Sequence, residues 1–407
     1  MGEKMALVSL ERMKEIMDVP PAAEILLNKS EKEIRFSLNL KMLRDKILCF
    51  DAFVVYHNVV MGPAKGGVRF SPAVSMEETR NLAEIMTYKN ALMGLPFGGG
   101  KSGIRFNPYN MDDFTRIAVI KEYVHMIREE LFSGAYIPAP DMGSTPQDMA
   151  TIYGETHRPE SVTGKPVIVG GLPGRLQATG RGVSHAVKLG IENMMGRKLK
   201  ESRITIQGFG NVGRWTAYFL HQMGAKITGV SDIGGAVYNR NGMDIGKLLE
   251  YSPTSRDTVK GFPGGEPIGT SEFMSLESDV FIPAVLEKVV TAGTAPKIKA
   301  GMIVEGANDP TTEEGEKALL GKGVRILPDF FANSGGVIAS YIEWRNAKSG
   351  NQTSDKEVFD MIDSKIEETF LAGVRANKEL KCDSLREAFS SLALNALIEA
   401  MKARLWI

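Results

Sequence analysis

The chain has 407 residues, of which 43% are hydrophobic, and its 49 basic side chains balance 49 acidic ones. This is the composition of a globular protein long enough for about two domains, and its balanced charge predicts no binding to nucleic acid or membrane. No apolar run approaches the roughly 18 residues that span a bilayer. The two cysteines, Cys49 and Cys382, indicate neither a disulfide framework nor a metal site, so we expect a cytoplasmic protein without metal.

The N-terminal part is predicted from its hydrophobic periodicity. A helix is expected over residues 5–18, followed by strands over 33–41 and 46–57 that form a hairpin because no helix separates them. Residues 62–70, in which Lys65 precedes two glycines, are interpreted as a loop.

A capping box of Ser75 and Glu78 begins the next helix. Along it Lys89 recurs at helical spacing with Leu82, Ile85, Met86 and Met93, so it falls on the apolar face. A buried lysine is costly unless an anion meets it, although its stem can also carry the ammonium group out to solvent.

Residues 98–103, Gly-Gly-Gly-Lys-Ser-Gly, are interpreted as a glycine-rich loop in which Lys101 is the catalytic candidate. Glycines without a Cβ let a ligand approach the backbone closely, and a lysine beside them suits an anion or a carbonyl group. A phosphate-binding P-loop is the first alternative, but Leu95 stands where its first glycine belongs and no buried strand precedes it. A flexible connector with a chance lysine is the second.

A third helix is expected over about 112–132, before the proline-rich segment 137–147. Prolines preset the backbone on both sides of Asp141, which makes it a candidate general acid or base, with a simple turn aspartate as the alternative. Thr145 and Pro146 fit the N-cap and first position of a further helix. The glycine-dense segment 170–182 is interpreted as a hinge or linker.

A dinucleotide-binding fingerprint follows. Residues 203–207 form a short buried strand, the next six give Gly-Phe-Gly-Asn-Val-Gly, and a helix then leads to a second strand over 225–232. Gly208 makes the tight turn, Gly210 admits the pyrophosphate and Gly213 lets the helix pack on the strand. Asn211 and Val212 lie between these glycines at the helix N-terminus, where free amides favour negative charge.

Asp232 ends the second strand, where a carboxylate accepts hydrogen bonds from ribose hydroxyls and repels a 2′-phosphate. It therefore favours NAD slightly over NADP, while Arg240, near in sequence, softens that preference. Further strands are expected over 279–284, 302–305 and 324–328, and helices over about 354–378 and 384–405.

These elements predict an α/β fold with two parts. Residues 1–176 form a substrate-binding and oligomerisation domain with a mixed sheet, and residues 177–336 form a Rossmann-like dinucleotide-binding domain. Residues 337–407 are expected to return as helices to the first domain, with the active site in the cleft between the two.

The chain resembles the glutamate dehydrogenase group of amino-acid dehydrogenases from about residue 30 to 345. Its shared motifs, in sequence order, are His57-Asn58, Lys65-Gly-Gly-Val-Arg-Phe70, Lys89-Asn-Ala91, Pro96-Phe-Gly-Gly-Gly-Lys101, Pro140-Asp141, Ala178-Thr-Gly-Arg-Gly182, Gly208–Gly213, Glu305-Gly-Ala-Asn308 and Asn333–Ser340. Asp309 departs from the pattern, because a glycine is usual at that position.

The resemblance implies roles for individual residues. Lys101 would activate the attacking water, and Asp141 would pass protons to and from the substrate nitrogen. Lys89 would bind the α-carboxylate of glutamate, and the side-chain pocket would be formed by Lys65, Gly66, Val337 and Ser340. Thr179 and Asn333 would contact the nicotinamide end of the cofactor, and Asn308 its ribose. The resemblance also implies a homohexamer that interconverts glutamate with 2-oxoglutarate and ammonia, using NAD or NADP.

Two other interpretations stay open at this point. Leucine and phenylalanine dehydrogenases are similar to this group but have an apolar residue at position 65, so the chain could instead act on an apolar amino acid. The other interpretation is a catalytically silent relative that senses amino acids or assembles into complexes. The sequence speaks against it, because every position with a role in the reaction carries a suitable residue type.

Overall fold

The computed structural model describes every residue except 1–6, 43–46 and 286. Residues 5 and 6 of the predicted first helix and residue 46 of the second predicted strand lie outside the described residues. The chain forms two compact units. The first unit comprises residues 10–175, 337–358 and 392–407, and the second comprises residues 7–9, 176–336 and 359–391. None of the helices described is long and apolar enough to cross a membrane.

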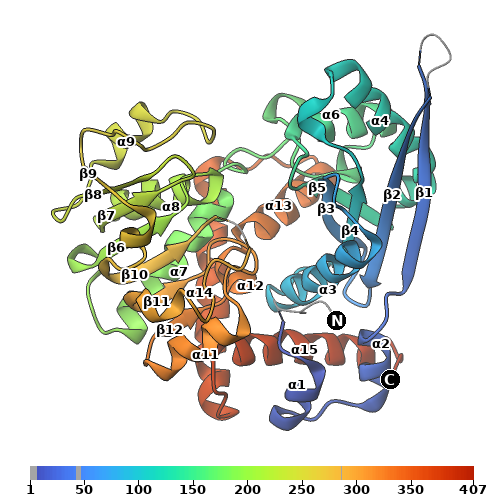
Figure 1. The fold of residues 1–407 in the computed structure, drawn as a ribbon. Coiled ribbons are helices and arrows are strands. Elements are labelled where there is room, and N and C mark those ends of the chain that lie inside the picture. The colour runs from blue at the N-terminus through green and yellow to red at the C-terminus, as the bar shows by residue number, and fades with distance from the viewer. Residues whose placement is uncertain (1–6, 43–46, 286) are drawn as a thin grey trace. The chain divides into compact units, whose positions relative to one another are not determined.

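A five-stranded mixed sheet of order β1-β2-β4-β3-β5 forms the centre of the first unit (Figure 1). Its strands are β1 (Lys32–Lys41), β2 (Ile47–Asn58), β3 (Ala64–Phe70), β4 (Gly98–Ile104) and β5 (Tyr136–Pro140). Strand β2 is antiparallel to β1 and β4, whereas β3 is parallel to β4 and β5. The predicted hairpin is therefore confirmed as β1–β2.

The helices of this unit include α1 (Leu10–Ile16), α2 (Pro21–Leu27), α3 (Met76–Leu92), α4 (Asp113–Met126), α5 (Arg128–Ser133), α6 (Pro146–Thr156) and most of α13 (Gly335–Ser349). Ser75 caps α3 by accepting from the backbone N–H of Glu78. Thr145 caps α6 by accepting from the backbone N–H of Asp148, whose carboxylate accepts in return from the backbone N–H of Thr145. The single helix predicted over 112–132 is interrupted at Ile127, where α4 ends and α5 begins.

Two predicted loops are strands in the structure. Residues 62–70 and 98–103 lack the alternation of apolar and polar residues that marks a strand, yet β3 and β4 pair with each other in the middle of the sheet. Their glycines are explained by close packing. A Cβ at Gly99 would lie 2.0 Å from the hydroxyl oxygen of Thr87 on α3, and a Cβ at Gly66 would lie 1.6 Å from the carbonyl oxygen of Gly100. These glycines therefore allow α3, β3 and β4 to pack closely, and they do not form an open loop.

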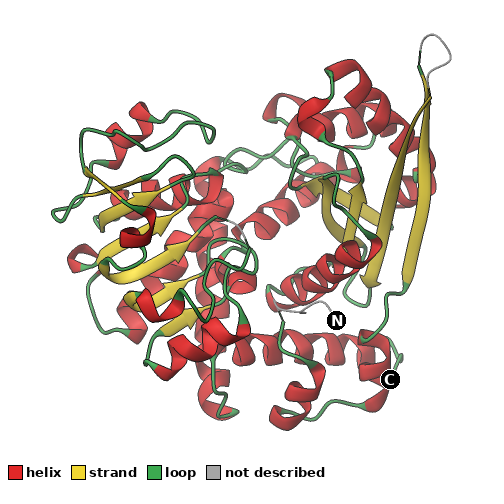
Figure 2. Ribbon diagram, viewed as in Figure 1, coloured by secondary structure: helices red, strands yellow, loops and turns green. Residues whose placement is uncertain are grey.

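The second unit contains a seven-stranded sheet of order β12-β11-β10-β6-β7-β8-β9, shown with its flanking helices in Figure 2. The strands are β6 (Arg203–Gln207), β7 (Lys226–Ser231), β8 (Ala236–Tyr238), β9 (Glu266–Ile268), β10 (Glu277–Pro283), β11 (Lys299–Val304) and β12 (Arg325–Leu327). Strands β12 to β7 are parallel, whereas β8 and β9 are antiparallel additions at one edge. The strand order reverses between β6 and β10, and ligands of such sheets bind beyond the strand ends at this point.

The helices of the second unit include several that were not predicted from the sequence. The helices of this unit include α7 (Ala178–Met194), α8 (Asn211–Gln222), α9 (Ile245–Tyr251), α10 (Thr270–Phe273), α11 (Glu313–Gly321), α12 (Asp329–Ala332) and most of α14 (Asp355–Glu379). The prediction of a hinge or linker over 170–182 is wrong for residues 178–182, which form the beginning of α7. Gly180 is helical, and a Cβ there would lie 2.6 Å from Cβ of Trp215 on α8.

The C-terminal helices α14 and α15 (Leu385–Ala403) match the two helical runs that were expected. The predicted domain boundaries stay predictions. In the structure, residues 359–391 group with the nucleotide-fold unit, whereas residues 337–358 and 392–407 group with the first unit.

Candidate active site

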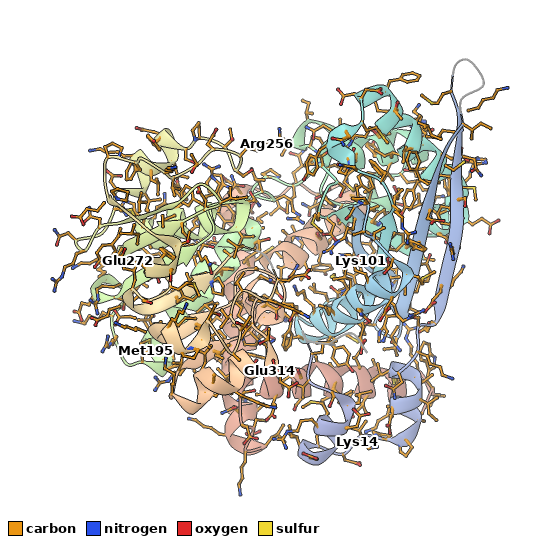
Figure 3. All side chains as sticks on the ribbon, in the orientation of Figure 1. Lys14, Lys101, Met195, Arg256, Glu272 and Glu314 are labelled. Atoms are coloured by element: carbon orange, nitrogen blue, oxygen red, sulfur yellow. The ribbon has the colours of Figure 1, made fainter. Side chains whose placement is uncertain are left out.

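Cationic side chains extend from one face of the sheet in the first unit. Lys65 and Arg69 lie four positions apart on β3, and Lys65 pairs with Gly99 of β4. Gly99 lies two positions before Lys101, which is labelled in Figure 3. Paired residues of neighbouring strands point to the same side and alternate residues return to it, so Lys65, Arg69 and Lys101 share this face. Helix α3 packs on the same face, because Thr87 occupies the space that a Cβ of Gly99 would need.

Asp141 follows directly after β5 and forms an ion pair with Lys101. A guanidinium nitrogen of Arg69 lies 3.7 Å from the other carboxylate oxygen, and the backbone N–H of Met142 donates to it at 2.6 Å. Burial by itself raises the pKa of Asp141, but Lys101 and Arg69 outweigh it and the pKa is lowered. Gly67 leaves room for this carboxylate, since a Cβ there would lie 2.7 Å from that of Asp141. Lys101 and Asp141 are thus brought together as a buried pair.

Lys65 is 97% buried, and among the described residues no carboxylate forms an ion pair with it. Its pKa is lowered from the ordinary value of 10.5 to about 7, chiefly by burial. The positive charge of Arg175 also lowers the pKa, by more than the negative charge of Glu343 raises it. Lys165 and Lys101 act in the same direction as Arg175. A buried cation surrounded by other cations is expensive, so this part of the site is suited to an anionic ligand group.

Ser340 lies on α13, which a buried ion pair holds in the first unit. The ammonium group of Lys165 donates at 2.8 Å to Glu343, and Glu343 also accepts from the backbone N–H of Gly164 at 2.8 Å. Ser340 precedes Glu343 by three residues, so the two share a helix face, and Val337 lies a further turn back, half-buried. The charge of Glu343 also raises the pKa of Lys65, which opposes the effect of Arg175.

Lys89 is buried near the C-terminal end of α3, as predicted. Of the apolar residues expected on the same face, Met93 is fully buried, whereas Leu82, Ile85 and Met86 are half-buried. The fully buried side of α3 contains the small residues Ala83 and Thr87, which permit its close approach to β4.

Arg175 is a candidate that the sequence did not reveal. It lies in the glycine-dense segment interpreted as a hinge, and it contributes more than Lys101 does to the low pKa of Lys65. Its Nε atom is buried and, within the described residues, has no hydrogen-bond partner. A buried guanidinium nitrogen without a partner, in a residue whose charge acts on Lys65, indicates a second group that is available to an anion.

The second unit presents a dinucleotide site at the predicted fingerprint. Gly208 has φ of 101°, a conformation that favours glycine, and a Cβ there would lie 2.4 Å from the carbonyl oxygen of Ala284 after β10. Gly210 faces open space, and a Cβ at Gly213 would lie 1.8 Å from the carbonyl oxygen of Gly208. Helix α8 then begins at Asn211 without a side-chain cap, so the amides of its first turn, including that of Val212, are available to a pyrophosphate. The glycine fingerprint and the start of α8 therefore fit the pyrophosphate of a dinucleotide.

A polar loop follows β11 in the same unit. The side-chain amide of Asn333 donates to the side-chain oxygen of Asn308 at 2.9 Å and contacts the carbonyl oxygens of Gly306 and Ala307. Thr179 lies in the first turn of α7, next to Ala178, whose carbonyl oxygen would be 2.0 Å from a Cβ on Gly335. The structure thus places Thr179, Asn308 and Asn333 on segments of one unit.

Asp232 directly follows β7, at the strand end where it was expected, but the backbone at Arg240 is not near it. The backbone N–H of Asn239 donates to the carbonyl oxygen of Thr228, so Arg240 lies beside the start of β7. Thr228 lies four positions before Asp232 along the chain, which is about 13 Å in a strand. The expectation that Arg240 softens the cofactor preference is therefore wrong, since β8 carries the chain away from the strand end.

A buried cluster supports the loop that carries Asn308. Arg386 donates to Glu305, Glu316 and Asp329, at 2.8, 2.6 and 3.3 Å, respectively. Asp329 in turn accepts from the backbone N–H of Asp309 at 3.0 Å. Asp309 has φ of 46°, and one of its carboxylate oxygens is buried without a partner among the described residues. Burial, followed by the charge of Asp329, raises the pKa of Asp309 to about 7.

Replacing Asp309 with asparagine should therefore change how stability depends on pH. The folded protein keeps the Asp309 proton up to about pH 7, whereas the unfolded chain loses it near pH 4, so stability falls as the pH rises between these values. Asp309→Asn removes this titration and tolerates the left-handed backbone. We expect a variant whose melting temperature exceeds that of the wild type by a few degrees at pH 8 and by less at pH 5. Equal differences at both pH values would contradict this assignment.

The two units together define an α/β dehydrogenase with a dinucleotide-binding sheet and a lysine-rich site for an anionic substrate. Comparisons with known proteins agree with this class. Residues 30–158 match the family model described as "Glu/Leu/Phe/Val dehydrogenase, dimerisation domain", and residues 170–404 match "Glutamate/Leucine/Phenylalanine/Valine dehydrogenase". The chain belongs to the Glu/Leu/Phe/Val dehydrogenase family, as its motifs predicted.

Individual relatives match over nearly the whole chain. The NADP-specific glutamate dehydrogenase of Saccharolobus shibatae is 40% identical over 385 residues, which cover 93% of this chain and 90% of the relative. The NAD-specific glutamate dehydrogenase of Peptoniphilus asaccharolyticus is 36% identical, covering 95% and 94%. The structure of a hetero-hexameric glutamate dehydrogenase from Thermus thermophilus in its leucine-bound form has a TM-score of 0.90 at 29% identity, covering 97% and 95%. The predicted two-part α/β fold is thereby confirmed.

Proposed function

We propose that the protein is an NAD(P)-dependent glutamate dehydrogenase, which oxidatively deaminates L-glutamate to 2-oxoglutarate and ammonia and catalyses the reverse amination. Relatives of this name at 36% to 40% identity support the activity. The observation that carries the choice of substrate is Lys65, which is buried on the same sheet face as Lys101 and has no carboxylate partner in the part of the chain that the structure describes. An apolar amino acid would leave this charge unpaired, whereas the side-chain carboxylate of glutamate compensates it.

The charged residues of the candidate site then have distinct roles. Lys65 and Ser340 bind the side-chain carboxylate, with Gly66 and Val337 shaping the pocket, and Lys89 binds the α-carboxylate. Asp141 accepts a proton from the substrate nitrogen, and Lys101 deprotonates the water that adds to the substrate iminium carbon. Because Asp141 already contacts Lys101, protons can move between the substrate nitrogen and Lys101 through its carboxylate.

The second unit supplies the cofactor site. The nicotinamide dinucleotide accepts hydride from the substrate Cα when it is bound. The amides of the first turn of α8 hold the pyrophosphate, and Thr179, Asn308 and Asn333 orient the nicotinamide end. The negative charge of Asp232 favours NAD slightly over NADP, and relatives of both specificities are known.

A homohexamer is proposed as the assembly. It is supported by the hexamer named for the Thermus thermophilus relative and by the dimerisation domain described for residues 30–158.

Initial rates with glutamate, leucine and phenylalanine, each with NAD and NADP, test the proposed function. We expect glutamate to be preferred over both apolar amino acids by at least about 10³-fold in kcat/KM, because an apolar side chain leaves Lys65 uncompensated. A preference for leucine or phenylalanine would instead favour the apolar-substrate alternative, and no turnover with any of them would favour a silent relative.

Substrate binding should take up a proton. With a pKa of about 7, Lys65 is largely neutral in the free protein at pH 8, and a bound carboxylate restores its charged form. Glutarate, an unreactive dicarboxylate, should therefore bind with uptake of close to one proton at pH 8 and of far less at pH 6. Calorimetry in two buffers of different ionisation enthalpy measures this uptake, and equal uptake at both pH values would refute the role of Lys65.

A further inference from the structure

The carboxylate of Asp232 is already engaged inside the protein. Its Oδ1 atom accepts from the backbone N–H groups of Gly234 and Gly235, at 2.7 and 3.1 Å, and from the hydroxyl of Thr258 at 3.0 Å. Its Oδ2 atom accepts from the backbone N–H of Val259 at 2.6 Å. Asp232 thus ties the turn after β7 to the segment 254–260, which follows α9 and is marked by Arg256 in Figure 3.

These bonds leave little acceptor capacity for a nucleotide. An ionised carboxylate has about four acceptor positions, two on each oxygen. Three donors share the two positions of Oδ1, and one donor occupies a position on Oδ2. A single acceptor position, on Oδ2, is therefore open. The 2′- and 3′-hydroxyls of an adenosine ribose would need two to bind Asp232 together. Of the four donors present, three are backbone amides that fix the turn, and only the Thr258 hydroxyl belongs to a side chain.

A lysine accompanies this arrangement. A Cβ built on Gly235 would lie 3.5 Å from Cβ and Cγ of Lys260, so the stem of Lys260 runs against the turn that carries Asp232. Lys260 is exposed, and its backbone N–H donates to the hydroxyl of Thr258 at 3.1 Å. A cation beside the ribose site is suited to a 2′-phosphate, which Asp232 alone would repel.

We propose that the segment 258–260 sets the choice between NAD and NADP, with Thr258 and Lys260 as its specificity-determining residues. The Thr258 hydroxyl competes with the ribose hydroxyls for Asp232 and so weakens the preference for NAD. Lys260 attracts the 2′-phosphate and so permits NADP. The inference rests on the proposed cofactor class and extends it to side chains outside the glycine fingerprint.

Replacing Thr258 with valine tests the first part. Valine keeps the shape of threonine but removes the one side-chain donor from Oδ1, so a ribose hydroxyl can take its place beside the amides of Gly234 and Gly235. Because one hydrogen bond contributes about 0.5–1.5 kcal/mol, we expect NAD to bind about two- to tenfold more tightly. NADP affinity should change less than twofold. Calorimetric titration of the whole protein with NAD, NADP, AMP and adenosine 2′,5′-bisphosphate measures binding without any turnover.

Matched variants separate this effect from general disturbance of the loop. Thr258→Ser keeps the hydroxyl and should bind as the wild type does. Thr254→Val removes a hydroxyl from the same segment, one that accepts from the backbone of Arg256 at 3.2 Å, and should also leave both affinities unchanged. Lys260→Met should lower the affinities for NADP and adenosine 2′,5′-bisphosphate about three- to tenfold, and the affinity for NAD should change less than about twofold.

Three results would overturn the inference. Thr258→Val could change the affinities for NAD and NADP equally, or it could selectively weaken the affinity for NAD. Lys260→Met could leave the affinity for NADP unchanged. Because these titrations contain no amino acid, they remain informative if glutamate turnover fails. Absence of binding by every nucleotide to the wild-type protein would overturn both the inference and the proposed cofactor.

Discussion

Replacement of Lys101 with alanine is expected to lower kcat for glutamate about 10³-fold or more while the protein stays folded. A positioned general base typically contributes about 10²- to 10⁴-fold, and here its loss also separates Asp141 from the group with which it exchanges protons. Folding should survive because Arg69 remains 3.7 Å from the Asp141 carboxylate and continues to compensate its charge. Steady-state kinetics, with thermal unfolding measured in parallel, check both expectations.

A second variant separates the charge of Lys101 from its basicity. Lys101→Arg retains the positive charge beside Asp141, but an arginine does not deprotonate in proteins, so it should be almost as inactive as the alanine variant. Lys121→Ala removes an exposed lysine that pairs with Glu155 and should leave kcat unchanged. Turnover of the Lys101→Arg variant within tenfold of wild type would show that Lys101 acts only through its charge, and the proposed proton transfer would fail.

The fold was predictable wherever the sequence carries a local pattern. The β1–β2 hairpin, the strand–turn–helix around Gly208 and the C-terminal helices were all expected, because periodicity, caps and a glycine fingerprint are local signals. Strands β3 and β4 were missed because their glycines imitate a loop. The reason for those glycines, the approach of Thr87 to Gly99, is a contact between segments that lie apart in sequence.

The candidate site was predictable as residue types but not as an arrangement. Lys65 and Lys101 share a face only because β3 and β4 pair in one particular register, which no local signal specifies. Arg386 was missed because its partner Glu305 is 81 residues away along the chain. The engagement of Asp232 by Thr258 is hidden for the same reason, although Asp232 itself was found from the fingerprint. Roles assigned from the resemblance stay predictions until variants are measured.

Replacement of Lys65 with leucine should change the substrate and stabilise the protein at the same time. The variant should lose about 10³-fold or more in kcat/KM for glutamate, because a buried carboxylate without a counter-charge is strongly disfavoured. It should gain activity with leucine or norvaline, whose apolar side chains match the new residue. Initial rates with glutamate, leucine and norvaline measure this exchange, and an unchanged ranking of the three would contradict the assignment of Lys65.

Stability shows whether the lost activity reflects the pocket or an unfolded protein. The folded-state pKa of Lys65, about 7, lies below that of an ordinary lysine, so between pH 7 and about 10 the unfolded chain binds more protons. The resulting cost to stability is present in full below pH 7 and disappears as the pH rises toward 10. Lys65→Leu removes this cost, so its melting temperature should exceed that of the wild type at pH 7, and by less at pH 9. A variant that is inactive toward glutamate yet more heat-resistant would locate the defect in substrate charge compensation, whereas lower stability at pH 7 would mean that Lys65 is paired in the free protein.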